Sequence, residues 1–503
     1  MKFTFNKQFM VLMFLLLNCF ASYAANEDLI TKQITIKLTE AGTLPDKIGR
    51  SEKNLVTNLK IIGEINGSDL RFIREMAGSE VNGHRTSGNL SVLDLSEARF
   101  VAEDDTYYTG NDIISDRSFQ DCKSLTSVII PSSVTEIGKF AFSGCSSLTS
   151  VNIPSSVTKI GGNAFSFCSL LTSVIIPSGV TEIGKYAFMG CSSLTSVNIP
   201  SSVKIIGDET FYGCRSLTSV NIPSSVTEIG KDAFENCSSL TSVIIPSSVT
   251  SIGGSAFEGC SSLTSVNIPS SVTEIGGHAF DGCCSLTSVN IPSSVTEIGR
   301  RAFYCCSSLT SVNIPSSVEW IGDDAFWYCS SLTSIDIPSS VTEIGEHVFC
   351  DCSSLTSVNI PSSVTSIGEG AFRSCRSLTS VNIPSSVTSI GEWAFYDCSG
   401  LRSIYVYAET VPSIGFGAFD GCDSENCTVY VPKGTYDAYW LSEWGYFDNI
   451  VEFDATNIRN IVAEPEVQEN ARYAVNGQRL TAPVKGINLV KYNNGRVKKE
   501  IVK

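Results

Sequence analysis

Histidine and charge are both scarce in this chain of 503 residues. It contains three histidines, and charged residues make up 17% of the sequence with a formal net charge of −16. Globular proteins usually carry about 25% charged residues. Binding to nucleic acid needs a basic face, which an acidic chain with few lysines and arginines does not supply. The composition therefore argues against nucleic acid as a partner.

The motifs of common catalytic centres are also missing. No serine stands in a nucleophile elbow, and no glycine-rich loop has the spacing that cradles phosphate. No Cys-x-x-Cys pair accompanies a matching histidine, as a zinc site of that kind requires. We therefore expect no enzyme activity, no catalytic residues, no cofactor and no metal site.

Long apolar runs are absent except at the N-terminus. Lys2 and Lys7 form a basic start before an apolar run over 9–20. Ser22-Tyr23-Ala24 then offers a cleavage site with small residues, after Ala24. This is the pattern of a secretory signal peptide over 1–24, and the run is too short to span a membrane. Cys19 leaves lipoprotein processing open, although an asparagine precedes it where a lipobox has a small residue.

Cysteine, by contrast, is frequent and regularly spaced. One cysteine recurs every 23 residues, at Cys122, Cys145, Cys168, Cys191, Cys214, Cys237, Cys260, Cys283, Cys306, Cys329, Cys352, Cys375 and Cys398. Pro131 and Phe142 recur with the same period. A fixed period of this length indicates a solenoid, in which each repeat is one turn of a coil.

The residues of one turn, such as 125–147, predict its local structure. Leu125, Val128 and Ile130 have the alternation of a strand with one buried face, and a proline then ends the strand. Further along the turn, Phe142 and Cys145 point inward and close the core. A single turn buries too little to fold alone, so neighbouring turns must stack.

The repeated pattern LxxVxIPxxVxxIGxxAFxxC resembles the BspA-type leucine-rich repeats of bacterial surface proteins, over about residues 90–422. The resemblance implies an α/β repeat solenoid, a leucine-rich-repeat-like coil with one parallel β-sheet, 23-residue turns and a cap at each end. It also implies an adhesin-like protein at the bacterial cell surface, associated with the outer membrane. Its partner would be a host extracellular matrix protein or a surface glycan.

The remaining segments divide the chain further. We predict an N-terminal cap over 25–89, with a helix whose N-cap is Ser68, and the solenoid over 90–427. An aromatic-rich segment over 428–453 is expected to cap the other end, with a carbohydrate site as the alternative. A linker follows over 454–470.

The last segment, 471–503, has eight basic residues and one acidic residue, and two Asn-Gly pairs that favour hairpin turns. We expect a small β unit here. It resembles the C-terminal sorting domains of the type IX secretion route, and a generic basic β tail remains the alternative.

The cysteine column is expected to hold reduced, buried thiols, because pairing would draw adjacent turns together. Three further cysteines are expected off the column, namely Cys284, Cys305 and Cys350, while Cys422 and Cys427 are close together near the end of the repeats. One disulfide among these five cysteines stays open.

Two surfaces are candidates for binding. The first is a polar row on the solvent face of the sheet, which includes Asn267, Asn290 and Asn313. The amides of this row could instead bond only to each other. The second surface lies where the turns differ, beside the repeated phenylalanine, and its aromatic residues are typical interface anchors. The candidates are Trp320, Trp327 and Tyr328 in one turn, with Tyr304, Trp393 and Tyr396 in others. Free variation at tolerant positions would explain the same pattern.

Two hypotheses follow. The first is a secreted, non-enzymatic surface protein that binds macromolecules. The second is a structural repeat protein that associates with copies of itself.

Overall fold

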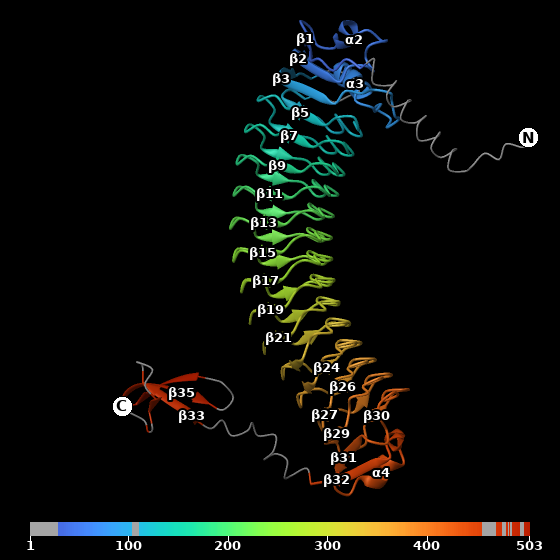
Figure 1. Ribbon diagram of the computed structural model, residues 1–503, viewed down its shortest axis with the longest axis vertical. Helices are drawn as coiled ribbons and strands as arrows, with labels where there is room; N and C mark the ends of the chain where they lie inside the picture. Colours follow the sequence, from blue (N-terminus) through green and yellow to red (C-terminus); the bar gives the residue numbers. More distant parts are fainter. Residues whose placement is uncertain are drawn as a thin grey trace, which may run out of the picture.

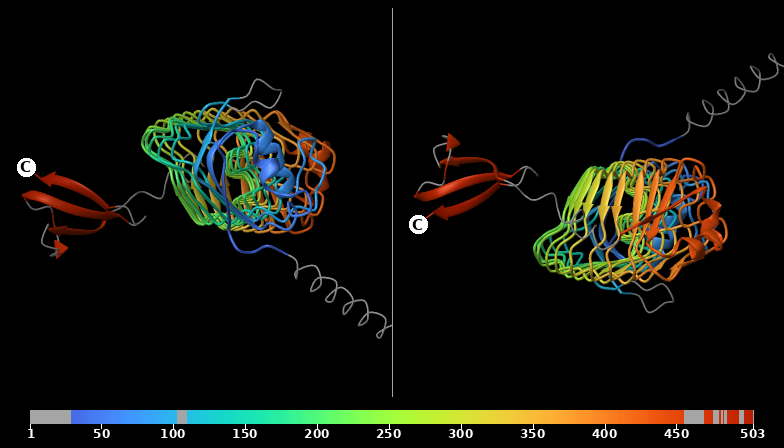
Figure 2. Two further views of the ribbon diagram at one scale, coloured as in Figure 1. Left: turned by 90° about the horizontal axis from the view of Figure 1, so that it is seen from above. Right: turned by 90° about the horizontal axis from the view of Figure 1, so that it is seen from below.

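The computed structural model describes residues 29–102, 110–454, 469–474, 479–480, 482, 485–492 and 497–502. The predicted signal peptide and most of the predicted linker lie outside these ranges. The described chain forms a curved coil of stacked turns (Figure 1), and a view along the coil shows the turns superimposed around a common interior (Figure 2). The predicted leucine-rich-repeat-like solenoid with 23-residue turns is confirmed.

One side of the coil is a parallel sheet to which each turn gives one strand. Within the repeats, the strands pair in register at a 23-residue offset, as Val197 does with Val220. The strands follow chain order in four hydrogen-bonded groups. They are β1 (Ile34–Lys37), β2 (Asn58–Ile65), β3 (Val92–Phe100), β5 (Ser127–Ile129), β7 (Ser150–Asn152), β9 (Ser173–Ile175), β11 (Ser196–Asn198), β13 (Ser219–Asn221), β15 (Ser242–Ile244), β17 (Ser265–Asn267), β19 (Ser288–Asn290), β21 (Ser311–Asn313), β23 (Ser334–Asp336), β25 (Ser357–Asn359), β27 (Ser380–Ile383), β29 (Ser403–Val406), β31 (Thr428–Pro432) and β32 (Asn449–Phe453).

The structure has a second, narrow parallel ladder, where one parallel sheet was predicted. Each of its strands has two residues, of which the second is an inward isoleucine. They are β4 (Ile113–Ile114), β6 (Glu136–Ile137), β8 (Lys159–Ile160), β10 (Glu182–Ile183), β12 (Ile205–Ile206), β14 (Glu228–Ile229), β16 (Ser251–Ile252), β18 (Glu274–Ile275), β20 (Glu297–Ile298), β22 (Trp320–Ile321), β24 (Glu343–Ile344), β26 (Ser366–Ile367), β28 (Ser389–Ile390) and β30 (Ser413–Ile414). The outward residues include a row of glutamates, and Lys159 bridges Glu136 at 3.9 Å and Glu182 at 3.5 Å.

The interior is built from columns of identical side chains. The repeated phenylalanines stack from Phe119 to Phe419, with ring centroids 5.0 to 5.7 Å apart. Each column cysteine from Cys145 onward donates its thiol hydrogen to a phenylalanine carbonyl of the preceding turn, as Cys145 does to Phe119 at 3.0 Å. Burial on all sides removes these thiols from water, and the hydrogen bond satisfies their only donor.

The cysteine column extends one turn beyond Cys398, the last of the thirteen cysteines with strict 23-residue spacing. One residue is inserted before Cys422, which stands 24 residues after Cys398. In the structure its sulfur donates to the carbonyl of Phe395 at 3.3 Å, as the other column cysteines do. The inserted residue is accommodated between β29 and β30, so Cys422 is a further member of the column.

At the N-terminal end, β1 and β2 continue the main sheet within the segment predicted as a cap. The helix α2 (Leu44–Lys47) and the helix α3 (Gly67–Met76) lie at this end, and α3 buries Leu70, Ile73 and Met76. The N-cap of α3 is Asn66 rather than Ser68. The Asn66 side chain accepts from the amides of Ser68 and Asp69, and the Asp69 side chain accepts from the amide of Asn66, which completes a capping box.

At the C-terminal end, the predicted aromatic segment contains β31, the helix α4 (Tyr436–Trp440), the 3₁₀ helix η1 (Glu443–Tyr446) and β32. Trp444 and Tyr439 are fully buried against the last turn, and each donates to a backbone carbonyl, of Pro412 and Ala408 respectively. No helix in the described part of the chain is long and apolar enough to cross a membrane.

The last segment contains an antiparallel sheet in the order β34-β33-β35-β36. Its strands are β33 (Glu469–Ala474), β34 (Arg479–Leu480), β35 (Gly486–Tyr492) and β36 (Val497–Val502).

Candidate functional site

The turns differ most in one strip of surface, here called the variable ridge. It consists of the residues two positions before and one position after each stacked phenylalanine. The residues before it are Phe140, Asn163, Tyr186, Glu209, Asp232, Ser255, His278, Arg301, Asp324, His347, Gly370 and Trp393. The residues after it are Ser143, Ser166, Met189, Tyr212, Glu235, Glu258, Asp281, Tyr304, Trp327, Cys350, Arg373 and Tyr396.

The backbone of the ridge has an unusual conformation that repeats in every turn. All the residues of the first row, from Phe140 to Trp393, have φ between 51° and 63°, and eleven of them are not glycine. This left-handed region costs an L-residue about 1–2 kcal/mol. Backbone hydrogen bonds between turns stabilise this conformation. The amide of Tyr186 donates to the backbone carbonyl of Asp208 at 3.0 Å, and the amide of His278 donates to the backbone carbonyl of Arg300 at 2.8 Å. The ridge therefore presents its side chains from a backbone that each neighbouring turn fixes.

The predicted aromatic group is divided between two parts of the turn. Trp320 lies on β22 in the second ladder, where its neighbour in register is Glu297. Trp327 and Tyr328 lie on or beside the ridge, and Tyr328 is 50% exposed. The ring contacts of Trp327 in the described structure are with Tyr304 and His347, in the turns on either side.

These contacts form a continuous strip of aromatic and charged side chains. The guanidinium of Arg301 lies 5.1 Å from the ring centre of Tyr304, and Tyr304 meets Trp327 edge to face at 5.7 Å. Trp327 stacks on His347 at 4.9 Å, and its indole nitrogen donates to Asp351 at 3.0 Å. Burial raises the pKa of the Tyr304 hydroxyl. The strip is a half-buried, preformed surface.

Asp324 fixes the charged members of this strip. Its carboxylate is buried, and it accepts from Arg301 at 3.1 Å and from Arg300 at 3.4 Å. His347 lies 3.8 Å away on its other side. Sequence reasoning gave Asp324 no role, because in the sequence it is one more variable residue. The signal that could have identified it is a lone acidic residue between Arg301 and His347 in one row of the ridge.

Further along the ridge, Trp393 and Tyr396 lie in the same turn and are both half-buried. The guanidinium of Arg373, in the preceding turn, lies 5.1 Å from the ring centre of Tyr396. The contact has the same chemistry as that of Arg301 with Tyr304, but Arg301 and Tyr304 belong to one turn. Of the predicted aromatic candidates on the ridge, Tyr304, Trp327 and Tyr396 thus each contact an arginine or a second ring.

The earlier turns of the ridge are acidic. Burial and the charges of Glu258, Asp232 and Glu209 raise the pKa of Glu235 to about 7. Burial also raises the pKa of Asp281, against the effect of its hydrogen bond with His278. Repulsion among carboxylates in successive turns therefore disfavours full ionisation of this segment.

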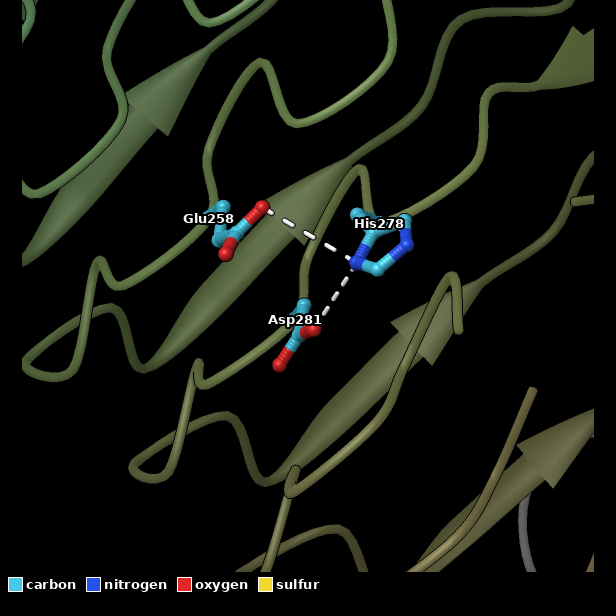
Figure 3. Close-up of side chains that lie close together, drawn as sticks. All are labelled: Glu258, His278 and Asp281. Carbon is cyan, nitrogen blue, oxygen red and sulfur yellow. Dashed lines mark hydrogen bonds and ion pairs between the residues drawn. The ribbon is translucent and has the colours of Figure 1, made fainter. Parts of the chain in front are cut away.

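One histidine lies among these carboxylates. The Nδ1 atom of His278 is 3.1 Å from Asp281 and 3.9 Å from Glu258 (Figure 3). The three side chains come from two adjacent turns, and one ligand atom from each falls within 4.8 Å of the others. The sequence predicted no metal site, because no Cys-x-x-Cys pair accompanies a matching histidine. Glu258 belongs to the turn before His278, so their closeness is evident only in the fold.

The predicted asparagine row lies on the solvent face of the main sheet, away from the ridge. Asn267, Asn290 and Asn313 are exposed at matching positions of β17, β19 and β21. Three exposed isoleucines interrupt the polar row, Ile129 at 36% exposure, Ile175 at 80% and Ile244 at 77%. This face is flat and regular, whereas the ridge differs from turn to turn.

The sequence of this chain is similar to those of known leucine-rich repeat proteins. The family model described as a BspA type leucine rich repeat region matches residues 112–241, 227–352 and 319–436. A leucine-rich repeat protein from Bacteroides ovatus is 32% identical, with 59% of this chain and 88% of that chain covered and a TM-score of 0.42. A leucine rich cell surface protein from Faecalibacterium prausnitzii is 37% identical, with 61% and 85% covered and a TM-score of 0.44. No curated protein matches the chain.

Proposed function

Since the chain belongs to the BspA-type leucine-rich repeat family, we propose that it is an exported, non-enzymatic surface protein that binds host matrix protein or surface glycan in an adhesin-like manner. The observation that carries this proposal is the strip from Arg301 through Tyr304 and Trp327 to His347. Aromatic and arginine side chains held by neighbours lose little conformational entropy when a partner binds, which is why they dominate interface energetics.

The test is binding of the purified protein to an array of matrix proteins and glycans. We expect saturable binding that falls at least tenfold in a Trp327→Ala/Tyr328→Ala variant. Trp320→Ala is the matched control, because it removes an exposed tryptophan of the same turn from the second ladder instead of the ridge. Hydrogen exchange should show that both variants keep the coil.

The results of this binding experiment distinguish a site on the ridge from a site on the main sheet. Equal loss in the Trp320→Ala control would contradict a site on the ridge. Binding retained in the ridge variant would favour the face that carries Asn267, Asn290 and Asn313. Hydrolysis of any matrix or glycan substrate would contradict the non-enzymatic assignment.

Self-association is the second candidate function. The regular face of the main sheet exposes Ile175 and Ile244 within its polar row, and a repeated flat face can pack against a copy of itself. Sedimentation velocity over a range of protein concentrations tests it. Association that disappears in an Ile175→Asn/Ile244→Asn variant would favour this candidate, since asparagine is the residue that most other turns carry there.

Export is part of the proposal. The signal-like N-terminus and the basic β tail at 471–503 support secretion with C-terminal sorting to the cell surface. Deletion of residues 471–503 should release the protein from the cell surface or leave it inside the cell envelope. An unchanged surface level, measured by protease accessibility on intact cells, would contradict the sorting role.

A further inference from the structure

The ridge holds a mixed set of metal-ligating atoms between β16 and β20. Glu258 belongs to one turn, and His278 and Asp281 belong to the next. His278 Nδ1 lies 3.1 Å from an oxygen of Asp281 and 3.9 Å from an oxygen of Glu258. A tetrahedral ion bound at about 2.0–2.1 Å holds its ligand atoms roughly 3.4 Å apart. The two distances from His278 are therefore close to the separation that such an ion imposes, and the two carboxylates offer oxygens within 4.8 Å of each other.

Two carboxylates and one imidazole leave this cluster of three side chains with more negative than positive charge. In the described structure, Glu258 and Asp281 each form an ion pair with His278 alone, so two carboxylates share one imidazole. Arg301, the nearest arginine on the ridge in the following turn, points to Asp324 at 3.1 Å instead. The turn before Glu258 adds Glu235 in the same row, which brings further negative charge. A bound cation would supply the charge that these side chains lack.

The three side chains are partly open to solvent, and the backbone that carries His278 is held in place. The side chains of His278 and Glu258 are 35% and 34% exposed, and that of Asp281 is 16% exposed. A cation can therefore enter from solvent, and coordination positions remain open for water. The backbone of His278 is fixed by its amide, which donates to the carbonyl of Arg300 at 2.8 Å.

We propose that Glu258, His278 and Asp281 form a binding site for a first-row divalent transition-metal cation, with zinc as the first ion to test. An imidazole nitrogen with two carboxylate oxygens suits such ions, whereas calcium and magnesium prefer oxygen ligands alone. This proposal is independent of the proposed adhesin-like function, because ion binding is measured on the protein without any other partner.

The experiment is calorimetric titration of the chelator-treated full chain with Zn²⁺, and separately with Ca²⁺. All proteins carry Cys284→Ser, because Cys284 is an exposed thiol that could bind zinc by itself. His278→Asn and Glu258→Gln remove a ligand each. His347→Asn is the matched control, because His347 occupies the same row and also has positive φ, at 52°. Asparagine tolerates this backbone conformation, so both histidine variants should fold.

We expect one zinc site per chain, with affinity at least tenfold weaker in His278→Asn and Glu258→Gln and unchanged in His347→Asn. The absence of saturable zinc binding would overturn the proposal, as would equal affinity in all variants. Tighter binding of Ca²⁺ than of Zn²⁺ would overturn the assignment to transition metals. Cobalt binding provides a second readout, since its absorption spectrum should show nitrogen and oxygen ligands without thiolate charge transfer.

Discussion

The imidazole ring of His347 stacks on the indole ring of Trp327 in the preceding turn, with ring centroids 4.9 Å apart. The same indole donates to Asp351, also in the following turn. Two side chains of one turn thus hold a tryptophan of the turn before it. A partner would meet a surface whose geometry is set before binding, which lowers the entropic cost of association.

The stacked phenylalanines should stabilise the coil locally. Phe257→Ala removes a ring that stacks on Phe234 and Phe280, and we expect a loss of about 3–5 kcal/mol in the local free energy of opening. Hydrogen exchange should show faster exchange in that turn and its two neighbours, because contacts in a solenoid are between nearest neighbours. Phe167→Ala, at a ring that is 53% exposed, is the control with little expected effect. Uniform loosening along the whole coil would contradict this prediction.

The thiols should differ sharply in reactivity. Burial raises the pKa of column thiols such as Cys260 to about 12, and the thiolate is the reactive form. Cys284 is exposed. With iodoacetamide at pH 8, we therefore expect Cys284 to be alkylated in the native protein, while the column cysteines react only after unfolding. Peptide mass spectrometry over time measures both, and alkylation of Cys260 as fast as that of Cys284 would contradict the buried column.

The left-handed backbone of the turns should make some glycines costly to replace. Gly213 has φ of +68°, and a β-carbon there would meet no atom closer than 3.8 Å. Gly213→Ala should therefore cost about 1 kcal/mol through backbone conformation alone. Gly49→Ala is the control, since it has comparable space but no positive φ. Local hydrogen exchange measures the loss of stability caused by each substitution. Equal losses would contradict the prediction that the positive φ of Gly213 causes the cost.

The acidic part of the ridge should make stability depend on pH. The pKa of Glu235 is raised from its usual 4.5 to about 7 in the folded protein, so the folded state binds more protons than the unfolded state between these values. Stability near this turn should then fall as pH rises from about 4.5 to 7. Glu235→Gln in metal-free protein should remove part of that decrease and be more stable than the native sequence at pH 8. Local opening measured by hydrogen exchange at pH 5 and pH 8 tests this, and the prediction is wrong if the native sequence is the more stable protein at pH 8.

The inward residues of the repeats could be predicted because every turn places them in the same environment. The positions represented by Leu125, Val128, Phe142 and Cys145 are buried as expected. The second ladder was missed because a strand of two residues is too short to show alternation. The N-cap of α3 was misplaced because both Asn66 and Ser68 are residues that favour caps, and only the hydrogen bonds distinguish them.

The sequence by itself determined the coil, its 23-residue period, the stacked phenylalanine and cysteine columns and the row of asparagines on the sheet. These follow from a repeated pattern of burial, which is local and identical in each turn. Only the tertiary structure decided that Trp327 contacts His347, that Asp324 is buried between Arg301 and His347, and that His278 lies between Glu258 and Asp281. Those contacts join different turns, and they depend on the direction in which the left-handed backbone projects each variable side chain. A periodic pattern carries no information about that direction, because it describes what the turns share and not where they differ.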